Sequence, residues 1–98
     1  MLIKMGVDIS RLNREARRAL RKVSDLFYGF GQEAVVTSTY EGDHGAGSLH
    51  YANDAFDIRL PDPDIVGIIG TLKANLGPDF DIVLESDHIH IEYDPKQF

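Results

Sequence analysis

The sequence contains no cysteine and no tryptophan. A disulfide framework and a thiolate metal site are both excluded, so any metal ligands must be histidine, aspartate or glutamate. No apolar run approaches the roughly 20 residues of a membrane span, and the first residues, MLIKMGVDIS, lack the apolar segment of a signal peptide. We therefore expect no membrane association and a protein that is cytoplasmic as synthesised.

The length leaves room for little more than one hydrophobic core. The chain has 98 residues, of which 43% are hydrophobic and 27% charged. This length and composition are typical of a single globular domain, expected here over residues 1–98. So small a domain buries only part of the surface that its unfolded chain exposes, and a bound metal would help to stabilise it.

Charge is unevenly distributed along the chain. Residues 1–23 hold seven basic and two acidic residues, a net charge of +5, whereas the remainder holds three basic and fourteen acidic residues, a net charge of −11. A basic helix of this kind can bind nucleic acid or another anionic polymer. The overall charge of −6 disfavours phosphate-backbone binding, and we expect a solvated helix face and no nucleic-acid partner.

Apolar periodicity predicts two helices. From Asp8 to about Gly29, apolar residues recur at spacings of three and four, with Asp8 or Ser10 as the N-cap and Gly29 and Gly31 at the end. A second helix is expected after Pro61-Asp62-Pro63, with Asp62 as N-cap, and Gly77-Pro78 should end it.

Four segments are predicted to be strands. They are 34–39, 54–60, 79–85 and 88–93, and the last two are joined at Ser86-Asp87, which is typical of a hairpin. Residues 40–53 contain three glycines and few apolar residues, which predicts a long loop. This order of elements favours an α+β domain with helices packed on one side of a small, mostly antiparallel sheet.

Period-two alternation sorts the polar residues of these strands. It places His88, His90 and Glu92 on one face of the last strand, and Asp57 on the polar face of the strand over 54–60. Taken alone, a His-x-His pair is a weak indication of a metal, since an exposed polar face is the more frequent explanation. If the two strands are neighbours, Asp57 and His90 share one cleft.

His50, at the end of the long loop, is the second candidate imidazole for this cleft. Two imidazoles and one carboxylate suit zinc, which with three protein ligands keeps a fourth position for water. Asp87, in the turn before His88, is the candidate general base for that water, although aspartate is also a common turn former.

Two segments, SLHYANDAFD and SDHIH, carry a resemblance to a known family. They resemble the metal-binding signature of the zinc D-alanyl-D-alanine carboxypeptidases and phage L-alanyl-D-glutamate endopeptidases, which share the Hedgehog/DD-peptidase fold. The resemblance implies His50, Asp57 and His90 as zinc ligands, Asp87 as catalytic base, and His88 as the residue that polarises the carbonyl or stabilises its oxyanion. Ser38 and Tyr40 are similar to the family's Ser and aromatic positions before the loop.

The chain also departs from the family pattern. Asn53 stands where many members have glycine. Glu41 stands where an arginine commonly binds a substrate carboxylate, which disfavours carboxypeptidase action more than endopeptidase or amidase chemistry. Glu85 and His88 have the same spacing as Asp87 and His90, so they are an alternative pair for the acidic residue and histidine of the motif. His44 is a further histidine of the loop and is expected to be exposed.

The leading expectation is a zinc metallopeptidase that cleaves peptidoglycan peptides by a metal-activated water. A phage or prophage lysis protein that reaches the cell wall by another route would fit the resemblance. The alternative is a catalytically inactive, zinc-stabilised binding module on the same scaffold, which Glu41 favours. Neither expectation specifies an oligomeric state.

Overall fold

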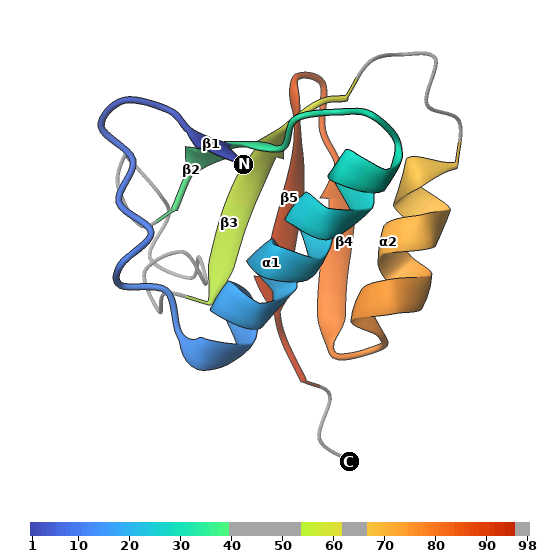
Figure 1. Cartoon of the computed structure of the whole chain (residues 1–98). Helices are drawn as coiled ribbons and strands as arrows, with labels where there is room; N and C mark the ends of the chain where they lie inside the picture. Colours follow the sequence, from blue (N-terminus) through green and yellow to red (C-terminus); the bar gives the residue numbers. More distant parts are fainter. Residues whose placement is uncertain (40–53, 62–66, 96–98) are drawn as a thin grey trace.

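The computed structural model describes residues 1–39, 54–61 and 67–95, and all structural statements concern these residues. They form β1 (Leu2–Ile3), α1 (Arg14–Gly29), β2 (Val35–Ser38), β3 (Ala55–Arg59), α2 (Ile68–Leu76), β4 (Phe80–Leu84) and β5 (His88–Tyr93). Figure 1 shows the five strands as one sheet with the helices packed against it. The structure is a small α+β domain, as the order of predicted elements indicated.

The sheet is mixed, with the strand order β1-β2-β3-β5-β4. β1 pairs in parallel with β2, and every other neighbouring pair is antiparallel. β1 was not predicted from the sequence, because two residues are too few to show a period. The predicted hairpin is confirmed: β4 and β5 pair directly, and the Glu85 amide donates to the His88 carbonyl across the turn at 2.9 Å.

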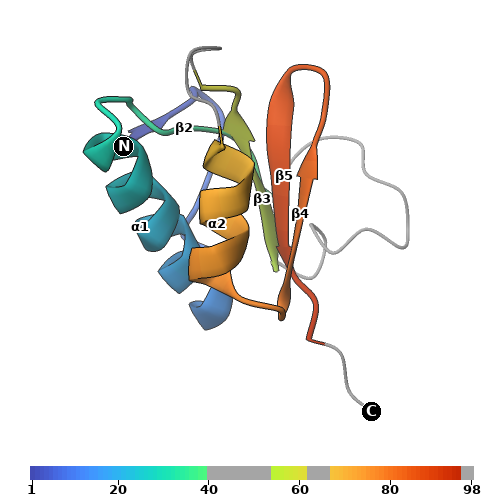
Figure 2. The same ribbon diagram turned by 90° about the vertical axis from the view of Figure 1, so that its right-hand side faces the viewer.

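Both helices cover the same face of the sheet, as Figure 2 shows. The apolar stripe of α1 is buried against α2 and against β3 and β5, so the core is a single layer between helices and sheet. Its largest fully buried side chains are Phe27, Phe56, Ile58, Leu72, Ile89 and Ile91. The opposite face of the sheet is therefore the one on which polar side chains of β3 and β5 gather.

The first helix begins later than the sequence predicted. Its N-cap is Asn13, so neither Asp8 nor Ser10 caps it. The Asp8 carboxylate instead accepts a hydrogen bond from the Ser10 amide at 2.8 Å in a local turn ahead of the helix. Leu12 still reaches the core from this irregular segment. The predicted end of the helix is confirmed by Gly31, whose φ of 73° is the left-handed conformation that follows many helices.

The second helix begins at Ile68 with Gly67 as its N-cap, so its start is also later than predicted. The predicted cap Asp62 and Pro63 lie outside the described residues. The predicted stop is confirmed, because Gly77 is the C-cap and its amide donates to the Lys73 carbonyl. No helix in the described part of the chain is long and apolar enough to cross a membrane.

Candidate functional site

The side chains of interest project from the face of the sheet opposite the helices. β3 and β5 are neighbours, with Asp57 directly opposite His90 and Arg59 opposite His88. Since directly opposed residues of antiparallel strands point to the same face, the pairing brings the predicted carboxylate and imidazoles together. The prediction that Asp57 and His90 lie together required their strands to be neighbours, and β3 and β5 are neighbours.

Asp57 and His90 are in direct contact. The Asp57 Oδ1 atom accepts a hydrogen bond from His90 Nδ1 at 2.8 Å. Asp57 is only 8% exposed, because β3 lies inside the sheet between β2 and β5. Ser38 of β2 is opposite Asp57 on the other side, after an irregularity in the β2 register. A carboxylate this buried needs hydrogen-bonding or charged partners, and His90 is one of them.

The second ring nitrogen of His90 also meets a carboxylate. His90 Nε2 lies 2.5 Å from Glu92 Oε1 on the same strand. The hydrogen bond to Asp57 raises the pKa of His90 above its ordinary value. Burial of the ring opposes this increase, whereas the hydrogen bond to Glu92 and the negative charges of both carboxylates add to it. In the metal-free protein His90 is therefore an imidazole held between two anions.

His88 connects Asp57 to the turn before β5. Its Nε2 atom lies 3.6 Å from Asp57 Oδ2, and its Nδ1 atom donates to Asp87 Oδ1 at 2.6 Å. The Asp87 side chain is 84% exposed. We refer to Asp57, Asp87, His88, His90 and Glu92 as the imidazole–carboxylate cluster.

The structure thus brings four of the five predicted site residues together: Asp57, Asp87, His88 and His90. The fifth, His50, lies outside the described residues, as do Tyr40, Glu41, His44 and Asn53. The sequence analysis assigned no role to Glu92, although its place on the face of His88 and His90 was recognised. The signal that could have identified it is its position two residues after His90 on that face.

Asp57 and His90 supply two donor atoms of the kinds that zinc takes in proteins. A carboxylate oxygen and an imidazole nitrogen from adjacent strands face each other across 2.8 Å at a partly buried position. Both donor types are ordinary zinc ligands. A bound cation would balance the negative charge of Asp57 in place of a protonated His90. Two protein donors are fewer than a zinc site needs, so the fit requires at least one more ligand, for which His50 is the expectation.

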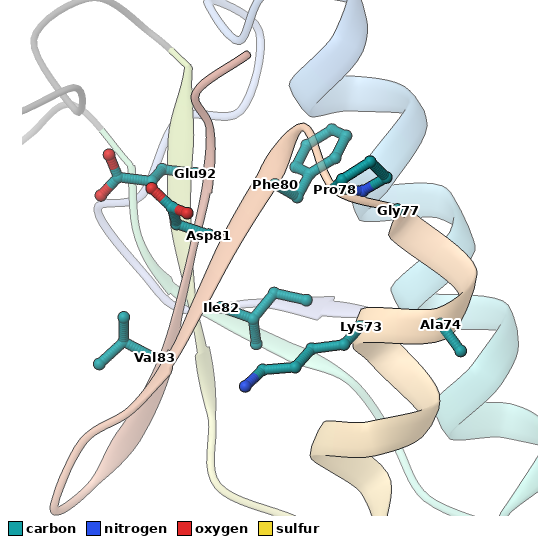
Figure 3. A pocket seen from close by; sticks show the side chains of 9 residues that line it. All are labelled: Lys73, Ala74, Gly77, Pro78, Phe80, Asp81, Ile82, Val83 and Glu92. Carbon is teal, nitrogen blue, oxygen red and sulfur yellow. The ribbon is translucent and has the colours of Figure 1, made fainter. Parts of the chain in front are cut away.

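A second acidic group lies beside this cluster. One carboxylate oxygen each from Asp81, Glu92 and Asp94 lies within 4.8 Å of the others, and these three residues could hold a metal ion. We call them the carboxylate cluster. Asp81 is opposite Glu92 in the β4–β5 pairing, and Figure 3 shows their carboxylates side by side. An all-oxygen donor set of this kind suits Ca²⁺ or Mg²⁺ better than zinc.

A shallow groove follows the outer strand β4. It encloses about 610 Å³ and is lined by the end of α2, by β4 and by Glu92 (Figure 3). Lys73 lies on its helix side, while Asp81 and Glu92 lie on the side of the polar face (Figure 3). The groove therefore reaches from the end of α2 across β4 to Glu92.

Comparison of the chain with protein-family models, with curated proteins and with solved structures gives no significant match. The resemblance to the zinc DD-peptidases therefore rests on the motif residues themselves.

Proposed function

We propose that this protein is a zinc-dependent peptidase or amidohydrolase acting on peptidoglycan-type peptides. The observation that carries the proposal is the contact between Asp57 and His90, with His88 and Asp87 adjoining it on one sheet face. These residues come from two segments thirty or more positions apart, and they are the ones to which the motif resemblance assigns roles. The Hedgehog/DD-peptidase fold is part of this proposal.

Asp57 and His90, with His50, would hold the zinc ion. When bound, the ion supplies a water of lowered pKa and a positive charge near the scissile carbonyl. For His90, binding means giving up the Nδ1 proton that Asp57 accepts without metal. The buried position of Asp57 strengthens its interaction with the cation, because little solvent screens it.

Asp87 would act as the general base and afterwards deliver the proton to the leaving amine. Its exposed position in the turn leaves it accessible to substrate, and His88 Nδ1 holds it at 2.6 Å. As an imidazolium, with a proton on each ring nitrogen, His88 would donate to Asp87 through Nδ1 and to a developing oxyanion through Nε2. One histidine would thus orient the base and stabilise the negative oxygen.

The proposal is tested by the release of new amino groups from purified peptidoglycan of several bacterial types. The zinc-loaded wild type should release them, and Asp87→Asn should abolish release while zinc content stays at the wild-type level. Asp25→Asn is the matched control, because Asp25 is an exposed carboxylate on α1, which packs on the other face of the sheet.

Two other outcomes would contradict parts of this proposal. Zinc binding without hydrolysis of any peptidoglycan would favour the inactive binding module. Undiminished activity of Asp87→Asn would show that another group accepts the proton.

A further inference from the structure

The two ring nitrogens of His90 have different carboxylate partners. Nδ1 meets Asp57 Oδ1 at 2.8 Å on the neighbouring strand, and Nε2 meets Glu92 Oε1 at 2.5 Å on its own strand. Asp57 is a proposed zinc ligand, whereas Glu92 is not. The ring therefore presents one nitrogen to the proposed metal position and the other to a carboxylate outside it.

A neutral imidazole carries one proton and one lone pair, and a metal can bind only the nitrogen with the lone pair. The hydrogen-bond acceptor at the other nitrogen decides which tautomer is present. Without such an acceptor, His90 could keep its proton on Nδ1, where Asp57 accepts it. That tautomer would have no lone pair on the side of Asp57.

We infer that Glu92 is a positioning residue that keeps the ring proton of His90 on Nε2 and so makes Nδ1 the metal-binding atom. This inference rests on the proposed zinc site and assigns a role to a residue outside the ligand set. Glu92 does not touch the substrate or the metal in this arrangement. Its effect passes entirely through the orientation and protonation of the His90 ring.

The surroundings of Glu92 suit this role. Its side chain is 23% exposed, so solvent competes only weakly for its contact with His90. The fully buried Ala55 lies opposite it on β3, and Asp81 lies opposite it on β4. Asp81 and Asp94 each place a carboxylate oxygen within 4.8 Å of one of Glu92.

The test compares Glu92→Ala and Glu92→Gln with Asp81→Asn as the matched control. Asp81→Asn removes one charge of the carboxylate cluster without removing the acceptor at His90. Zinc affinity is measured by competition with a chromophoric chelator. Loss of a carboxylate that orients a metal-binding histidine typically lowers affinity about 10- to 100-fold, which we expect for Glu92→Ala. Glu92→Gln keeps an oxygen acceptor and should recover part of that loss, and Asp81→Asn should bind like the wild type.

The ring nitrogens of His90 are observed directly by ¹⁵N NMR. In the zinc-loaded wild type, Nε2 should carry the proton and Nδ1 should show the shift of a metal ligand. In metal-free protein with a neutral ring, Glu92→Ala should move the proton toward Nδ1, a readout that needs neither zinc nor activity.

Three results would overturn the inference. They are wild-type zinc affinity in Glu92→Ala, zinc bound through Nε2, or an unchanged ring tautomer in metal-free Glu92→Ala. Failure of the zinc proposal itself looks different, because the wild type would then bind no zinc while the metal-free tautomer would still report on Glu92.

Discussion

Replacing Asp57 by asparagine tests the central contact of the site in the metal-free protein. The substitution keeps shape and an acceptor oxygen but removes the charge that faces His90. A hydrogen bond involving a charged group contributes about 1.5–3 kcal/mol and a neutral one about 0.5–1.5 kcal/mol, so Asp57→Asn should lower the free energy of unfolding by about 1–1.5 kcal/mol. For a domain of this size that corresponds to a fall in melting temperature of about 4–12 °C.

The loss should depend on pH in a defined direction. The hydrogen bond to Asp57 raises the pKa of His90 in the folded protein. The stability from protonated His90 is therefore fully present below the ordinary histidine pKa and disappears as pH rises through the raised value. The wild type should be more stable at about pH 6, above the carboxylate range, than at about pH 9, and Asp57→Asn should show a flatter dependence.

Urea unfolding followed by circular dichroism, with a chelator present, measures both effects. The difference between wild type and Asp57→Asn should be largest at the acidic end and shrink toward the alkaline end. Asp25→Asn, which removes an exposed carboxylate of α1, serves as the control and should change stability little. An equal loss at both ends, or a larger one at alkaline pH, would refute the charge interaction.

Three further outcomes follow from the fold and the site. Ile58→Ala removes a fully buried side chain of the central strand and should lower the free energy of unfolding by about 2–5 kcal/mol in denaturant titrations. Gly31→Ala should lower the free energy of unfolding by about 1–2 kcal/mol, because Gly31 has a φ of 73°, although no atom would clash with the added Cβ. Gly29→Ala has the same space for a Cβ and no positive φ, so it should not destabilise the protein. At a pH where His90 is protonated, zinc binding should release protons in calorimetry with buffers of different ionisation enthalpy. Binding without proton release at that pH would exclude His90 Nδ1 as a ligand.

The face on which each polar residue lies was predictable from sequence, because it depends only on the period of two. The apolar residues on either side of Asp57 and of His90 are buried in the core. The structure thus confirms that the apolar and polar residues of these strands lie on opposite faces of the sheet. Their direct opposition was not predictable, since it depends on the order of strands in the sheet. That order places β5 rather than β4 beside β3.

The errors have local physical causes. The segment after Asp8 continues the apolar spacing of α1, yet it forms turns, in which the Asp8 side chain accepts from the Ser10 amide and the Ile9 carbonyl from the Leu12 amide. β1 is a strand because it pairs with β2. Its two residues alone do not predict that pairing. The carboxylate cluster escaped notice because Asp81 and Glu92 meet only through the β4–β5 register.

The zinc content of the purified protein and its variants shows whether Asp57 and His90 hold a metal ion. We predict one zinc per chain, lost in Asp57→Ala, His90→Ala and His50→Ala, and retained in Asp81→Asn. A protein that binds no zinc would contradict this prediction. So would zinc that survives His90→Ala and disappears in Asp81→Asn, because the metal would then lie in the carboxylate cluster.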